Sequence, residues 1–231
     1  MRSLLLFLMP YALWGMTLVH GVLLAVFLRK YKATKNILFL LSGLVTAGLF
    51  YDALILSLGT VLYRGPLLQA LSQVRFISHG GLIPLLFPIC AHALTRRKGI
   101  VRAVWAVTGI LIVLGIAEGF VTVLEPRDVG GVIRYASGEE TPSWASAVSS
   151  ALSYGTVIPL IFVGIAAWVR EKTPALFLSG FLMFAFAALG PATGNFDLIF
   201  FISMGGEVLM VLFLYVYACQ KDKGRKAAGR I

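Results

Sequence analysis

Long apolar runs alternate with short polar segments along the whole chain. Seven of the runs could cross the roughly 30 Å hydrocarbon core of a bilayer, for which a helix needs about 20 apolar residues. They cover residues 4–28, 37–62, 67–94, 101–124, 144–169, 174–192 and 196–219. This pattern predicts an all-α integral membrane protein with seven transmembrane helices.

The first run resembles a signal peptide at its start, because Arg2 precedes apolar residues. It continues to about Leu28 without a small-x-small cleavage site, and Arg29 then opens a basic stop-transfer segment. We therefore expect a first helix that is retained.

Basic residues mark every second connection between the runs. They are Arg29, Lys30, Lys32 and Lys35, then Arg96, Arg97, Lys98 and Arg102, then Arg170 and Lys172, and in the tail Lys221, Lys223, Arg225, Lys226 and Arg230. Basic loops remain on the cytoplasmic side of a membrane. The pattern predicts an outside N-terminus and a cytoplasmic C-terminus, in the plasma (inner) membrane.

A short internal repeat suggests how the helices are organised. Residues 76–83 (FISHGGLI) recur as residues 201–208 (FISMGGEV), and residues 41–43 (LSG) recur as 178–180. We expect a 3+1+3 parallel pseudo-repeat, in which the Gly-Gly pairs are helix contacts. Its parts are a first repeat at 1–94, a connector helix and extracellular loop at 95–143, a second repeat at 144–219 and a basic cytoplasmic tail at 220–231.

Composition supports the membrane assignment and argues against other classes. The 231 residues are 59% hydrophobic and 13% charged, with a formal net charge of +10. No basic stripe with interleaved aromatic residues occurs outside the tail, so we expect no nucleic-acid partner. Cys90 and Cys219 lack metal or disulfide spacing and are interpreted as small buried hydrophobic residues.

The long connection at residues 125–143 is rich in residues that break regular structure. Pro126, Gly130, Gly131, Gly138 and Pro142 predict a segment without a helix or strand. We expect a solvated tether, with a lid over an outer cavity as the alternative.

Ionisable residues inside the apolar runs are the candidate site, since each costs roughly 2.5–3.5 kcal/mol to insert. Glu207 and His79 fall near the midplane of their runs, and Asp52 and Arg75 fall further outward. Arg75, Ser78, His79 and Leu82 share one helical stripe, which the repeat maps onto Phe200, Ser203, Met204 and Glu207. We expect Glu207 and His79 to face one polar interior. The residues expected beside them are Ser78, Ser203, Tyr51 and Asn195.

Each of these residues also has a structural interpretation. Glu207 could be a protonated hydrogen-bonding group, His79 a bridge between helices, and Arg75 either a partner of Asp52 or a side chain that extends to the surface. His20 and Glu118 have no counterpart in the repeat and are interpreted as structural.

The first functional hypothesis is an intramembrane acid–base enzyme that acts on a lipid-soluble substrate. Glu207 or Asp52 would donate a proton and His79 would accept one, while Arg75 would hold an anionic headgroup or orient Asp52. In topology and acid placement the chain resembles the small seven-helix membrane terpene cyclases, which have one acid in the second helix and another in the last. Their tryptophan–acid motif is replaced here by Tyr51 before Asp52.

The second hypothesis is a small carrier, with or without proton coupling. The 3+1+3 plan resembles that of SWEET-type sugar transporters, which bind substrate between the triplets. Those proteins have prolines at repeated positions, whereas Pro84 and Pro88 have no counterparts in the last run.

The sequence contains no HExxH, no Gly-x-Ser-x-Gly, no phosphate loop and no clustered His/Cys set. We therefore expect no metal and no cofactor. The expected partners are membrane lipids and a hydrophobic small-molecule substrate.

Overall fold

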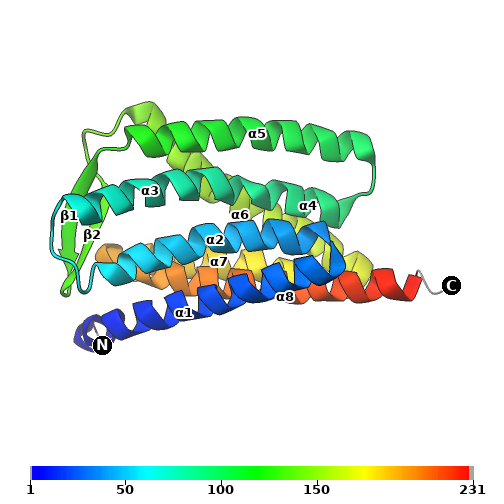
Figure 1. The fold of residues 1–231 in the computed structure, drawn as a ribbon, viewed down its shortest axis with the longest axis horizontal. Coiled ribbons are helices and arrows are strands. Elements are labelled where there is room, and N and C mark those ends of the chain that lie inside the picture. The colour runs from blue at the N-terminus through cyan, green and yellow to red at the C-terminus, as the bar shows by residue number, and fades with distance from the viewer. Residues whose placement is uncertain (1, 229–231) are drawn as a thin grey trace.

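A computed structural model of the protein describes residues 2–228 as a helical bundle with one β-hairpin (Figure 1). In chain order the elements are α1 Arg2–Thr34, α2 Ile37–Leu58, α3 Pro66–Leu82, the 3-10 turn η1 Ile83–Leu85, α4 Leu86–Leu94, α5 Lys98–Val121, β1 Leu124–Val129, β2 Val132–Ser137, α6 Ser143–Glu171, α7 Ala175–Ala192, η2 Phe196–Leu198 and α8 Ile199–Ala228.

Seven spans in the described chain are long and apolar enough to cross a membrane, as predicted. They are Ser3–Thr34, Ile37–Leu58, Pro66–Leu94, Lys98–Val121, Ser143–Glu171, Ala175–Ala192 and Phe196–Gly224. The helices lie side by side along the long axis, with the hairpin and the N-terminus at one end and the C-terminus at the other (Figure 1). We call these the hairpin end and the tail end.

The spans form a closed ring in chain order. Each span contacts the next, and α8 closes the ring against α1 while also contacting α2. Ion pairing fixes the tail end, because Lys221 of α8 contacts Glu171 of α6 at 2.7 Å. Arg170 also donates to the carbonyl of Leu94 at 2.8 Å, which joins the ends of α6 and α4.

The third span is interrupted, whereas the sequence predicted one continuous helix over residues 67–94. Two prolines account for the break, because neither Pro84 nor Pro88 has a backbone N–H to donate to the preceding turn. The chain therefore changes to a 3-10 turn at Ile83–Leu85 before α4 begins.

Glycines bring several helix backbones into contact. A Cβ on Gly80 of α3 would overlap the backbone of Gly115 of α5, and one turn along, Gly119 meets the backbone of Ile77. Gly205 and Gly206 of α8 face Phe186 of α7. Both Gly-Gly pairs predicted from the sequence are therefore helix contacts, as small residues often are in membrane proteins.

The long connection forms a β-hairpin, so the prediction that it lacks regular structure is wrong. Leu124–Val129 pairs with Val132–Ser137 in antiparallel register. Gly130 and Gly131, with φ of +60° and +83°, form the two-residue turn between the strands. A Gly-Gly pair suits such a turn because glycine adopts positive φ without a steric penalty.

The hairpin packs onto the bundle, so the predicted solvated tether is also wrong. Val132 is fully buried among side chains of α1, α2 and α8. The amide of Ile133 donates to the carbonyl of Gly59 at 2.9 Å, and the hydroxyl of Tyr135 donates to the carbonyl of Gly65 at 3.2 Å. The hairpin therefore covers the ends of α2 and α3.

The two halves of the bundle are filled differently. The largest cluster of buried apolar side chains lies toward the tail end and includes Phe27, Leu41, Ile89, Leu160 and Tyr217. On the side formed by α3, α6 and α7, the half toward the hairpin is hollow instead.

Candidate functional site

A cavity of about 900 Å³ lies toward the hairpin end, bounded mainly by α2, α3, α6, α7 and α8. This volume is near the upper end of the roughly 300–1,000 Å³ that is typical of small-molecule sites. Most of its wall is apolar, from side chains such as Leu49, Phe76, Val157 and Met183. The ionisable side chains in the wall are Asp52, Arg75, His79, Glu118 and Glu207.

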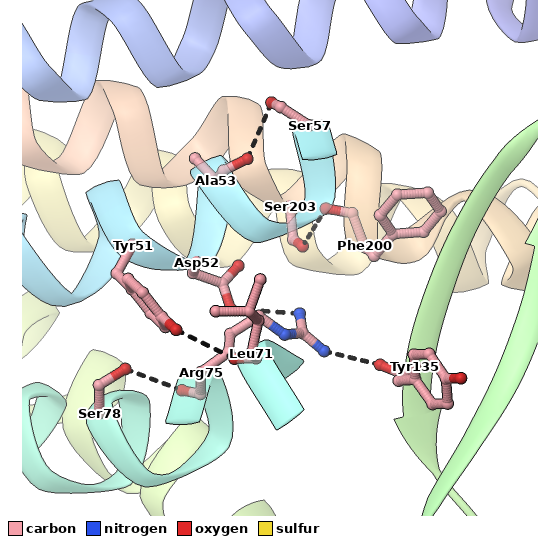
Figure 2. Close-up of polar contacts among 10 residues, drawn as sticks. All are labelled: Tyr51, Asp52, Ala53, Ser57, Leu71, Arg75, Ser78, Tyr135, Phe200 and Ser203. Atoms are coloured by element: carbon pink, nitrogen blue, oxygen red, sulfur yellow. Dashed lines mark hydrogen bonds and ion pairs between the residues drawn. The ribbon is translucent and has the colours of Figure 1, made fainter. Parts of the chain in front are cut away.

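Arg75 joins two helices and the hairpin at the cavity wall. Its Nη1 donates to Oδ1 of Asp52 at 3.2 Å, and its Nη2 donates to the carbonyl of Tyr135 at 2.8 Å (Figure 2). The guanidinium also lies over the ring of Phe76, with its Cζ 4.8 Å from the ring centroid. Arg75 and Asp52 therefore pair across α2 and α3, which was one of the two possibilities in the sequence.

Glu207 has a carboxyl oxygen without a hydrogen-bond partner among the described side chains. The residue is 7% exposed, and its Oε2 accepts no hydrogen bond from residues 3–224. The adjacent Gly206 holds α8 close to α7, where a Cβ would meet Met183 and Phe186. A buried polar atom without a partner is rare in proteins and calls for a ligand, a water or a functional role.

His79 lines the same cavity and also has a buried ring nitrogen, Nδ1, without a hydrogen-bond partner in the described part of the chain. The backbone contact of its neighbour Gly80 with Gly115 fixes the position of this part of α3. His79 of α3 and Glu207 of α8 thus line the same cavity.

The hairpin adds a second arginine above this end of the cavity. The guanidinium carbon of Arg134 lies 4.3 Å from the ring centroid of Phe200, which lines the cavity. Burial, with repulsion from Arg75 and Arg127, lowers the pKa of Arg134 to about 10. Arg134 therefore still carries its positive charge at neutral pH.

The other predicted binding residues divide into two groups. Ser203 lines the cavity, and its hydroxyl donates to the carbonyl of Phe200 at 3.1 Å (Figure 2). Tyr51, Ser78 and Asn195 are not among the lining residues. Their polar atoms are used locally, since Tyr51 donates to Leu71, Ser78 to Arg75 and Asn195 to Thr193.

Glu118, which the sequence analysis interpreted as structural, also belongs to the cavity wall. It lines the cavity from α5 and accepts a hydrogen bond from the hydroxyl of Thr122 at 3.1 Å. The sequence feature that could have identified Glu118 was the presence of an acidic residue inside an apolar run. The hydroxyl residues of α6 in the cavity wall, Ser149, Ser153 and Thr156, were also not predicted.

His20 does not belong to the cavity wall. It is fully buried on α1, and its Nδ1 lies 2.9 Å from the carbonyl of Met16. One turn of α1 closer to the hairpin end, the hydroxyls of Thr17 on α1 and Ser57 on α2 are 2.8 Å apart and join the two helices through a hydrogen bond. This setting agrees with the structural role expected for His20.

The arrangement supplies both partners of a proton transfer inside an apolar cavity. Glu207 and His79 each have a polar atom that no described residue bonds, while the charges of Asp52 and Arg75 balance one another. Among residues 2–228, no group of three or more His, Cys, Asp or Glu side chains is placed to hold a metal ion.

No protein-family model and no curated protein matches the chain.

Proposed function

We propose that this protein is an intramembrane enzyme that performs acid–base chemistry on a lipid-soluble substrate. One observation carries the proposal: Glu207 and His79 both line a largely apolar cavity, and each has a buried polar atom, Oε2 and Nδ1, without a hydrogen-bond partner among the described residues. An acid and a base that border one cavity are the minimum equipment for general acid–base catalysis.

The ion pair decides how the roles are divided. Asp52 is bonded to Arg75, whereas the carboxyl of Glu207 has no charged partner within salt-bridge distance among the described residues. We therefore assign proton donation to Oε2 of Glu207 and proton acceptance to Nδ1 of His79. Asp52 and Arg75 become positioning residues, and Arg75 is occupied with Asp52 and Tyr135 instead of an anionic headgroup.

An isomerisation or a cyclisation suits these two groups, because neither reaction needs a cofactor. The substrate gains one proton from Glu207 and loses another to His79, so its atoms are rearranged without net oxidation. Return of that proton from protonated His79 to the Glu207 carboxylate, directly or through water, resets the site.

The membrane orientation is part of the same proposal. The tail end carries the basic connections, so we place the C-terminus in the cytoplasm and the hairpin outside, in a plasma membrane. One pair of corresponding glycine contacts supports the 3+1+3 repeat, although the Gly-Gly pairs differ, since Gly80 meets α5 and Gly205 meets α7. Gly43 of α2 faces Phe27 of α1, and Gly180 of α7 faces Ile161 of α6 in the second triplet.

A deletion strain tests the function. Its lipids and metabolites would be profiled after complementation with the parent, with Glu207→Gln, or with Glu139→Gln as an exposed control. We expect one lipid or terpenoid product to vanish on deletion and to return with the parent and the control, but not with Glu207→Gln. Full recovery by Glu207→Gln would contradict the enzyme proposal.

A carrier is the second candidate, and one observation favours it. The third span is broken at Ile83–Leu85, and Ile83 itself lines the cavity between the triplets. Broken helices at a central site are typical of transporters. In that case the deletion would change the cell-to-medium gradient of a small molecule and leave the lipid profile intact.

A further inference from the structure

The cavity wall is exposed along one seam of the bundle, between α6 and α7. The lining residues classed as exposed are Ser153, Tyr154, Phe184, Ala188, Pro191 and Ala192. The lining residues that α2, α3, α4, α5 and α8 contribute are all buried or half-buried. The cavity therefore opens sideways, through the wall of the bundle.

The glycine contacts explain why this seam is open on one side only. Toward the tail end, Gly164 meets the backbone of Phe177 and Gly180 meets the backbone of Ile161, so α6 and α7 touch. Toward the hairpin end, Gly155 has no atom within 4 Å of the position of a Cβ. There Gly190 of α7 packs against Ile199 of α8 instead.

The opening extends from the first half of α6 to the last turn of α7. Tyr154 is eleven residues into α6, or about 16 Å from its first residue at 1.5 Å per residue, while Ala188, Pro191 and Ala192 lie at the C-terminal end of α7. The nearby surface is apolar, with Ile158, Phe181 and Leu189 between 42% and 45% exposed. Such a surface faces acyl chains more favourably than water.

The charges inside the cavity indicate what kind of polar end would enter. Its wall contains three carboxyl groups, on Asp52, Glu118 and Glu207, against one guanidinium, on Arg75. An anionic headgroup would find no free cationic partner among the lining residues, since Arg75 is already paired with Asp52 and Arg134 is not a lining residue. A hydroxyl or carbonyl oxygen can instead accept the proton of the Glu207 carboxyl without adding charge.

We propose that the seam between α6 and α7 is a lateral portal, through which an uncharged lipid with one hydroxyl or carbonyl end passes from the bilayer into the cavity. Its polar end reaches Glu207 and His79, and its apolar chain lies along Val157, Met183 and Phe184. This inference rests on the proposed function, because it specifies the substrate class and entry route of the same site.

Photolabelling tests the portal without any need for turnover. The purified protein in lipid nanodiscs would be irradiated with a diazirine-bearing long-chain alcohol, and adducts would be mapped by mass spectrometry on peptides containing Met183 and Met210. Ala188→Trp should reduce these adducts several-fold by filling the seam. Leu189→Trp, on the neighbouring exposed residue that does not line the cavity, should leave them unchanged, and Tyr154→Ala should increase them.

The outcomes separate the portal from the acid–base proposal. Equal labelling of Ala188→Trp and Leu189→Trp would overturn the portal, whatever Glu207→Gln does to the product profile. If Ala188→Trp misfolds, failure of Tyr154→Ala to increase the adducts overturns it instead. The matching diazirine fatty acid serves as a charged probe. If it labels the cavity as strongly as the alcohol does, the proposal that the substrate is uncharged is overturned. Portal-dependent labelling together with an active Glu207→Gln protein would leave the portal intact and refute the acid–base roles.

Discussion

The guanidinium of Arg75 on α3 bonds the carboxylate of Asp52 on α2 at 3.2 Å, and its other terminal nitrogen bonds the hairpin at Tyr135. Both side chains are about nine-tenths buried, with 10% and 12% of their surfaces exposed. One arginine thus holds two helices and the cover of the bundle together while forming part of the cavity wall.

Removing one member of this ion pair should destabilise the protein more than removing both members. Arg75→Met leaves Asp52 without its partner, and loss of one member of a buried pair costs about 3–5 kcal/mol. The double variant Arg75→Met/Asp52→Leu removes both charges and should recover part of that loss. Thermal unfolding in one detergent would compare the variants. A double variant no more stable than Arg75→Met would show that the ion pair is not what holds these helices.

The contact between Gly80 and Gly115 should tolerate no side chain. Gly80→Ala or Gly115→Ala would push α3 and α5 apart, because each Cβ would overlap the opposite backbone. We expect lower folded yield and a lower melting temperature for both variants. Gly109→Ala, also on α5, is the matched control, because nothing lies within 4 Å of its Cβ position. That control should be neutral or stabilised by up to about 1 kcal/mol.

Gly205→Ala should be milder than Gly80→Ala. The atoms nearest a Cβ at Gly205 belong to the ring of Phe186, at 3.1 Å and 3.2 Å, and a ring can shift where a backbone cannot. Equal loss of melting temperature in the two variants would contradict this difference in packing.

The orientation is testable with single cysteines in a Cys90→Ala/Cys219→Ala background. Glu140→Cys, in the exposed segment after the hairpin, should react with a membrane-impermeant maleimide added to intact cells. Lys98→Cys, at the exposed start of α5, should react only after the cells are lysed. The reverse pattern would invert the proposed topology.

Long-range packing was predictable from the sequence where a few residue types dictate it. The seven apolar spans follow from length and hydropathy, and the Gly-Gly pairs from the close approach of membrane helices. The depth and helical spacing of His79 and Glu207 agree with their both lining one cavity. The sequence left it open whether Arg75 pairs with Asp52 or extends to the surface. Pairing depends on how α2 and α3 are rotated about their axes, which the sequence does not determine.

The hairpin was missed because its turn residues were interpreted only as breakers. Gly130 and Gly131 stand between Val129 and Val132, which is the pattern of a two-residue hairpin turn. Pro126 was counted as a residue that breaks a strand, but proline is tolerated in an edge strand, and both strands of a two-stranded sheet are edge strands. The lateral opening could not be inferred from sequence, since it depends on where α6 and α7 are in contact along their lengths.

Lipid conversion by the purified protein tests most directly whether Glu207 works as an acid in this cavity. The parent, Glu207→Gln and Glu139→Gln would be reconstituted with lipid extracted from the deletion strain, and product formation followed by mass spectrometry. We predict conversion by the parent and Glu139→Gln, and a rate about 10²–10⁴-fold lower for a folded Glu207→Gln, the usual size of a general-acid contribution. Conversion by Glu207→Gln at the parental rate would contradict the proposed function.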